Sequence, residues 1–216
     1  DPSGRGKDET TYVVIKQLYG YLYVTAFGGV NGGYEEETLQ KLANIAKEEQ
    51  VNKIVIEDNF GDGMFTKLLE SELHKIYKCS TEEVKHHIRK EERIIDTLEP
   101  VMNSHKLVIS FEEIKKDIKE NYYAEKGATG TSEKSLNYSL LYQLTRMQRE
   151  KGCLKHDDRV DVLAIGVSYW TEMMSRDSEQ AREDYLEEKR RDQLHEFMEN
   201  ALGPEEWGRR RKDKGD

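Results

Sequence analysis

The pattern of apolar and polar residues in the first part of the chain predicts β-strands. Residues 11–17 and 21–28 are rich in β-branched and aromatic side chains, which favour strands. Tyr19-Gly20 lies between them and is typical of a tight hairpin turn. Shorter strands are expected at residues 53–56, 75–79 and 106–109.

Apolar residues recur at helical spacing in the segments between and after these strands. Residues 34–50 are the first example, with Leu39, Leu42, Ala43 and Ala46 on one face. Further helices are expected at residues 64–74, 90–102, 111–122, 135–151 and 159–173. A hairpin, then a strand–helix–strand unit, then helices together favour an α/β fold around a mixed sheet.

The last part of the chain differs from the rest because it has no clear apolar face. Residues 176–200 are charged almost all round, which is typical of a solvated helix or of one that needs a partner. We therefore predict a folded domain at residues 1–173 and a charged helical tail at residues 174–216. The tail is expected to be disordered toward its end, at residues 209–214.

Composition excludes several classes of protein. The 216 residues are 36% hydrophobic and 36% charged, and no run of about 18 apolar residues occurs, so no membrane span is expected. Cys79 and Cys153 are too few for a disulfide framework or a zinc site. The net charge of −9 argues against a passive nucleic-acid coat, but not against an enzyme that gathers acids around a metal.

Three acidic positions far apart in the sequence are the candidate catalytic residues. They are Asp1, Glu57 and the pair Asp157-Asp158, each at the end of a predicted element, where side chains can converge in a folded domain. Hard divalent cations prefer carboxylate oxygens, and two such cations can hold the attacking and leaving oxygens of a phosphodiester. The pattern therefore indicates a metal-dependent phosphodiesterase.

Each position also has an ordinary structural explanation. Glu57 ends a predicted strand, where polar residues are common, although ligand sites also form at that edge of an α/β sheet. One of Asp157 and Asp158 can simply cap the helix that follows. The opposite face of that helix should be core: Val160, Leu163, Ala164 and Val167. Side chains expected to support the ligands are Asp58, Asn59, His156 and Asp161.

Four short motifs, in order and in register, resemble the nuclease domain of the large terminase subunit of tailed phages, especially short-tailed ones. The motifs are DPSGRGKDET, IEDNFGDGMF, KEERIIDTLEPVM and LKHDDRVDVLA, and the resemblance runs from Asp1 to about Trp170. It implies an RNase H-like fold, with a central mixed β-sheet flanked by helices. It also implies an endonuclease that cuts concatemeric double-stranded DNA during genome packaging, using two Mg²⁺ or Mn²⁺ ions.

The resemblance implies roles for individual residues as well. Asp1, Glu57 and one or both of Asp157 and Asp158 would be the catalytic metal ligands, with Asp1 bridging the two ions. Basic residues near these acids are expected to contact the DNA backbone, although most charge runs are only solvated faces. The candidates are Arg5, Lys7, Lys90, Arg93, Lys126, Lys155 and Arg159.

Partners and location follow from the same resemblance. The partners would be double-stranded DNA, the portal protein and procapsid, the small terminase subunit and an ATPase domain of the same protein. The location would be the cytoplasm of the bacterial host. Two alternatives stay open: a docking module for the portal whose nuclease is silent in isolation, and another RNase H-like enzyme such as a resolvase or transposase.

Overall fold

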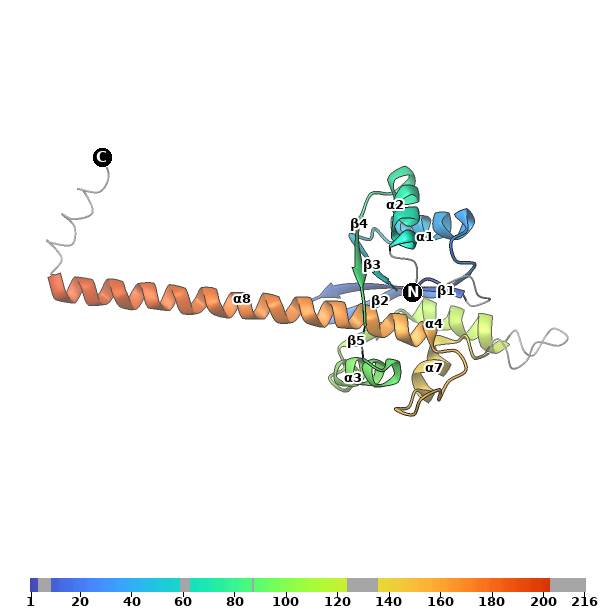
Figure 1. Cartoon of the computed structure of the whole chain (residues 1–216). Coiled ribbons are helices and arrows are strands. Elements are labelled where there is room, and N and C mark those ends of the chain that lie inside the picture. The colour runs from blue at the N-terminus through green and yellow to red at the C-terminus, as the bar shows by residue number, and fades with distance from the viewer. Residues whose placement is uncertain (4–8, 59–62, 87, 124–135, 203–216) are drawn as a thin grey trace. The chain divides into compact units, whose positions relative to one another are not determined.

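The computed structural model describes residues 1–3, 9–58, 63–86, 88–123 and 136–202. The chain divides into two units, Asp1–Trp170 and Thr171–Asp216. The described strands all belong to the first unit (Figure 1). The segment predicted to be disordered, residues 209–214, lies outside the described residues.

The larger of two sheets has three strands in the order β1-β2-β5. β1 (Glu9–Leu18) and β2 (Tyr21–Asn31) form an antiparallel hairpin, and β5 (Leu107–Ile109) runs parallel to β2. Tyr19 and Gly20 have φ angles of 51° and 78°, the left-handed conformations that suit a two-residue hairpin turn. The predicted hairpin and its turn are therefore confirmed, and the sheet is mixed.

The smaller sheet is a parallel pair of β3 (Lys53–Glu57) and β4 (Ser80–Val84). The helices α1 (Glu36–Glu48) and α2 (Met64–Ile76) pack against it. Figure 1 shows these two helices together beside β3 and β4. The side chains buried between them are Leu39, Ala43, Ala46, Ile56, Phe65, Leu69 and Leu73.

Two predicted elements have the wrong bounds. The strand expected at residues 75–79 is wrong, because α2 continues to Ile76 and the strand is β4 instead. Leu69, Leu73 and Ile76 follow helical spacing, which explains why the helix continues. The sequence of β4 is mostly polar, so its apolar pattern does not predict a strand. The helix expected at residues 135–151 is shorter, since α7 (Leu140–Arg146) ends where Met147 has an extended backbone.

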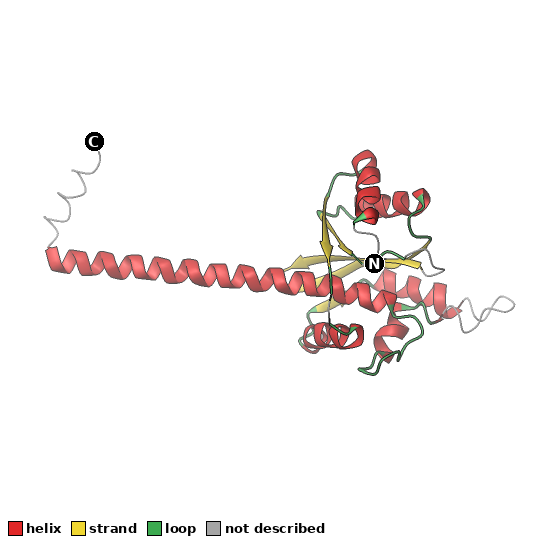
Figure 2. Ribbon diagram, in the orientation of Figure 1, coloured by secondary structure: helices red, strands yellow, loops and turns green. Residues whose placement is uncertain are grey.

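Helices supply the remaining framework of the first unit (Figure 2). α3 (Lys90–Asn103), α4 (Phe111–Ile118) and the short π-helix η1 (Lys119–Tyr123) follow the sequence prediction closely. Among the residues that the structure describes, no helix is both long and apolar enough to cross a membrane.

The last helix, α8 (Asp158–Leu202), is continuous across the boundary between the two units. Its first turns bury the predicted core stripe, and Val160, Leu163 and Val167 are each 0% exposed. From residue 175 to residue 197 every side chain is exposed, as expected for a helix that is charged all round. The predicted helical tail is thus confirmed over its described length.

Candidate metal centre

Three carboxylates from separate elements meet at the end of β3. Glu57 is the last residue of β3, Asp161 lies in the first turn of α8, and Asp1 is held beside β1. One oxygen atom of each lies within 4.8 Å of the other two. Hard oxygen donors at this spacing fit a divalent cation such as Mg²⁺ or Mn²⁺.

Asp1 is positioned by backbone pairing with β1. Its carbonyl accepts a hydrogen bond from Thr11 N at 3.0 Å, and its nitrogen donates to Thr11 O at 3.0 Å. Thr11 Oγ1 donates to the carbonyl of Asp158 at 3.3 Å, which ties the start of α8 to the same point. Burial lowers the pKa of the amino group of Asp1 to about 6, although the nearby carboxylates of Glu57 and Asp161 act to raise it.

Two of the three carboxylates are almost completely buried. Glu57 is 7% exposed and Asp161 is 1% exposed. Burial raises the pKa of Asp161 to about 6, Glu57 adds to the rise, and Lys90 and Arg93 oppose it. The fold therefore concentrates negative charge where water cannot screen it, which is unfavourable unless cations are close.

Helix α3 supplies two such cations, one turn apart. Lys90 Nζ lies 2.6 Å from Asp157, 3.3 Å from Asp158 and 3.2 Å from Asp161. Burial alone would lower the pKa of Lys90, but these carboxylates outweigh burial and raise it. Arg93 Nη2 lies 2.7 Å from Asp161 and 3.5 Å from Glu57, and its side chain is only 9% exposed.

The structure brings together part of the acid set expected from the sequence. Asp1 and Glu57 lie in the cluster, and its third member is Asp161, which the sequence indicated only as a supporting group. Asp157 and Asp158 pair with Lys90 at the edge of the site, and their side chains are 25% and 26% exposed. The signal for Asp161 was available, because it is an acid within an apolar run at the start of a core helix.

The other expected supporting residues occupy different positions around this edge. Asp58 directly follows Glu57 and forms an ion pair with Lys85 at 2.8 Å. His156 stacks on Tyr138, with ring centroids 4.3 Å apart and planes at 29°. Asn59 lies outside the described residues.

Of the four expected DNA-binding residues that the structure describes, three form ion pairs: Lys90, Arg93 and Arg159. Lys90 and Arg93 face the acids and neutralise part of their charge. Arg159 is held by Glu9 at 2.7 Å, and its side chain is 11% exposed. Lys155 is exposed. The remaining candidates lie outside the described residues: Arg5, Lys7 and Lys126.

Comparison with known proteins identifies similar sequences. Residues 1–107 match the family model described as the ribonuclease H-like domain of the bacteriophage T7 terminase. Over 202 residues the chain is 44% identical to the terminase large subunit of Enterobacteria phage T3. That match covers 94% of this chain and 33% of the T3 protein, so the chain spans about a third of the length of this curated relative.

Proposed function

Because this chain belongs to the family of terminase ribonuclease H-like domains, we propose that it is a divalent-metal-dependent endonuclease. Its substrate would be concatemeric double-stranded viral DNA, cut during genome packaging in the infected bacterium. The observation that supports this proposal most strongly is the meeting of Asp1, Glu57 and Asp161 within 4.8 Å. Three carboxylates gathered this closely at a buried point repel one another, and binding of a cation offsets that repulsion.

Two bound Mg²⁺ or Mn²⁺ ions would supply an activated water and stabilise the departing oxygen of the phosphodiester. In this proposal Asp1, Glu57 and Asp161 hold the ions. Asp157 and Asp158, which lie at the exposed edge, stay candidates for completing the coordination when Lys90 moves away. Lys90 and Arg93 keep the acids compatible with burial before the ions bind.

Contacts with DNA would follow the backbone and not the base sequence. Lys155 is exposed beside His156, just before the acid edge at Asp157 and Asp158, and could reach a phosphate. An acidic chain in which most described basic residues near the site are paired with acids should bind DNA weakly, with an affinity that falls as salt rises. We extend the proposal to the partners of a packaging machine: the portal, the procapsid, the small terminase subunit and an ATPase region of the same protein.

The test is cleavage of supercoiled plasmid by the purified chain with Mn²⁺, with Mg²⁺ and with EDTA. The proposal expects cleavage with either metal, none with EDTA, and loss of cleavage in Glu57→Gln. The matched control is Glu82→Gln, on the neighbouring strand β4, where the carboxylate is partly exposed and pairs only with Lys53. Cleavage by Glu57→Gln at the control's rate would reject the site. Strong preference for four-way junctions over plasmid would favour a resolvase instead.

A further inference from the structure

Two arginines of the first unit are buried to nearly the same degree, but their guanidinium groups are engaged differently. The side chains of Arg93 and Arg159 are 9% and 11% exposed. Arg159 uses all three of its side-chain nitrogens, because Nε and Nη2 donate to Glu9 and Nη1 lies 3.5 Å from Asp117. In Arg93, Nε and Nη1 are buried and have no acceptor among the described residues. Buried N–H groups without acceptors reduce stability, so stability alone does not account for the position of Arg93.

The remaining nitrogen of Arg93 lies between two carboxylates of the acid cluster. Nη2 is 2.7 Å from Oδ1 of Asp161 and 3.5 Å from Oε1 of Glu57. Glu57 ends β3, Asp161 lies in the first turn of α8, and Arg93 itself belongs to α3. A rigid, planar cation on a third element therefore fixes how closely these two side chains approach each other.

This contact balances the charge of Asp161 and leaves one of its oxygens unused. Oδ1 of Asp161 is buried and accepts no hydrogen bond from the described residues, although Nη2 of Arg93 is close to it. Such an oxygen stays available to a cation while Arg93 keeps its place. Lys90 differs, because its side chain is 34% exposed and it also contacts Asp157 and Asp158 at the edge of the site.

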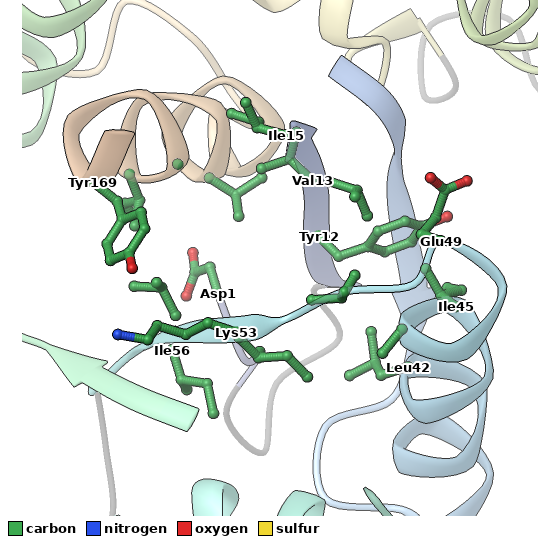
Figure 3. Close-up of a pocket in the computed structure, with 18 of the residues that line it drawn as sticks. Asp1, Tyr12, Val13, Ile15, Leu42, Ile45, Glu49, Lys53, Ile56 and Tyr169 are labelled. Atoms are coloured by element: carbon green, nitrogen blue, oxygen red, sulfur yellow. The ribbon is translucent and has the colours of Figure 1, made fainter. Parts of the chain in front are cut away.

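The third member of the cluster, Asp1, enters it from another side. Figure 3 shows the carboxylate of Asp1 at the wall of a cavity of about 530 Å³, which residues of β1, β3 and α8 line. Asp1 is half-buried, whereas Glu57 and Asp161 are buried. Arg93 thus contacts the two carboxylates whose mutual repulsion water screens least.

We propose that Arg93 is a positioning residue of the metal centre. It holds the carboxylates of Glu57 and Asp161 toward each other and stays in place when a cation binds, whereas Lys90 moves away. This role rests on the proposed function, since it concerns the same metal site. A DNA phosphate would have to displace neighbouring groups to reach the buried Nε and Nη1 of Arg93, which favours a role through the ligands over direct contact with DNA.

The sign of the effect on metal affinity separates positioning from simple charge. A cation beside a metal ion repels it, so charge alone predicts that removing Arg93 raises the affinity for Mn²⁺. Positioning predicts the reverse, because the ion must then bring two mutually repelling ligands together by itself. Groups that orient metal ligands typically change metal affinity by about 10–100-fold. Arg93→Met should therefore weaken Mn²⁺ binding by about tenfold or more.

The experiment is isothermal titration of Mn²⁺ alone into the wild-type chain and three variants. Arg93→Lys keeps the charge but not the planar guanidinium, so it should restore only part of the affinity that Arg93→Met loses. Arg159→Met is the matched control, because it removes an equally buried arginine outside the acid cluster, and it should change Mn²⁺ affinity by less than about twofold. Urea unfolding without metal establishes that each variant is folded. If Arg93→Met does not fold, Arg93→Lys decides, with a loss of about threefold expected from positioning and none from charge.

Plasmid cleavage at saturating Mn²⁺ then separates positioning from a contact with DNA. Positioning lowers kcat in Arg93→Met and leaves KM for plasmid within about twofold, whereas a lost DNA contact raises KM. Mn²⁺ affinities of Arg93→Met and Arg93→Lys equal to or above that of the wild type would overturn the proposal and leave the endonuclease assignment intact. A raised KM with unchanged Mn²⁺ affinity would overturn it in favour of a DNA contact. A wild-type chain that neither binds Mn²⁺ nor cleaves plasmid would reject the proposed function and this role of Arg93 with it.

Discussion

The first turn of helix α8 carries Arg159, which is partly buried, and Asp161, which is buried. The two residues belong to clusters that are built in opposite ways. Arg159 joins a network around Asp117, in which every described contact of the carboxylate is with a donor. Asp161 joins the acid cluster, in which its neighbours include two further carboxylates. The comparison separates a carboxylate surrounded by donors from one that shares its two cations, Lys90 and Arg93, with neighbouring carboxylates.

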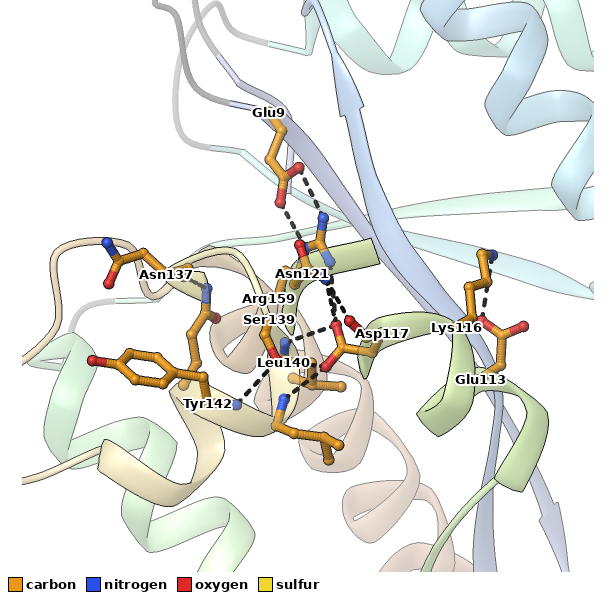
Figure 4. Close-up of polar contacts among 12 residues, drawn as sticks. Glu9, Glu113, Lys116, Asp117, Asn121, Asn137, Ser139, Leu140, Tyr142 and Arg159 are labelled. Atoms are coloured by element: carbon orange, nitrogen blue, oxygen red, sulfur yellow. Dashed lines mark hydrogen bonds and ion pairs between the residues drawn. The ribbon is translucent and has the colours of Figure 1, made fainter. Parts of the chain in front are cut away.

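The Asp117 network is matched group by group (Figure 4). Asp117 accepts from Ser139 Oγ at 2.6 Å, from Asn121 Nδ2 at 3.0 Å and from the backbone N–H groups of Leu140 and Leu141 at 3.3 Å. Arg159 Nη1 lies 3.5 Å away and completes the charge balance. Such a network fastens α4, the start of α7 and α8 to one another, and it offers no unused oxygen to a ligand.

The acid cluster has the reverse balance. Asp161 is as deeply buried as Asp117, but its described contacts are two cations from α3. Burial raises its pKa, and the nearby carboxylate of Glu57 adds to the rise. A buried carboxylate with too few donors and nearby like charges costs stability. The difference between the two aspartates is the one expected if Asp117 stabilises the fold and Asp161 binds a cation, as proposed above.

The largest expected effect separates the two candidates for the third ligand. Asp161→Asn should lower metal-dependent DNA cleavage by about a thousandfold, equal to ~4 kcal/mol of transition-state stabilisation, because a buried ligand is lost. Asp158→Asn, one helical turn away and partly exposed, should lower it by less than about tenfold. Plasmid cleavage rates at saturating Mn²⁺ measure both. A larger loss of cleavage in Asp158→Asn than in Asp161→Asn would indicate that Asp158, and not Asp161, is the third metal ligand.

The second-largest expected effect is on the free energy of unfolding, and it should appear only in the Asp117 network. Asp117→Asn removes the buried charge that accepts from Ser139, Leu140 and Leu141, and it should lower the free energy of unfolding by about 3 kcal/mol because these donors lose their charged acceptor. Glu112→Gln is the control on the same helix, where an exposed carboxylate pairs with Lys115 and should change stability by less than about 0.5 kcal/mol. Urea unfolding measures both. A loss equal to that of the control would mean that the network is dispensable.

These two clusters also show what the sequence could and could not predict. Asp1 and Glu57 were identifiable because each acid closes or opens an element beside turn-forming residues, and the motifs around them are in family register. Nothing in the sequence indicated that Asp117 is the centre of a buried network. Its partner Ser139 is far away in the sequence, and its partner Asn121 lies on a short π-helix. The ion pair of Arg159 with Glu9 could not be predicted either, because the two residues are 150 positions apart in the sequence.

The same limit applies to the sheet. Each strand could be recognised from local composition, apart from β4, whose polar sequence carries little strand signal. The division into two sheets could not be predicted, because pairing between strands depends on contacts between residues far apart in the sequence. Val13 of β1 and Ile56 of β3 line one cavity of about 530 Å³, and the local apolar pattern around either residue does not reveal it.

A smaller effect tests whether the α3 cations compete with metal. Lys90→Met should raise the affinity for Mn²⁺ by about tenfold, because it removes a positive charge 3.2 Å from Asp161 while keeping the length of the side chain. Arg89→Met is the adjacent control, since Arg89 pairs with Glu92 and not with the cluster. Isothermal titration of the metal alone gives both affinities. Unchanged or weaker binding by Lys90→Met would show that Lys90 does not occupy the cation position.

The smallest effect is a pair of opposite pH dependences that only the acid cluster should show. The pKa of Asp161 is raised from 3.8 to about 6, so the folded chain binds more protons than the unfolded chain between these values. The stability of the metal-free fold should therefore fall as pH rises from about 4 to 6. Metal affinity should rise over the same range, because the ligand must lose its proton, and it should be about twofold weaker at pH 6 than at pH 8.

Thermal unfolding measured across this pH range with and without Mn²⁺ follows the pH dependence of stability and of metal affinity. Asp161→Asn should flatten both dependences, whereas Asp117→Asn should not. Parallel slopes with and without metal would mean that Asp161 does not take part in binding, and the contrast between the two aspartates would then be one of packing alone.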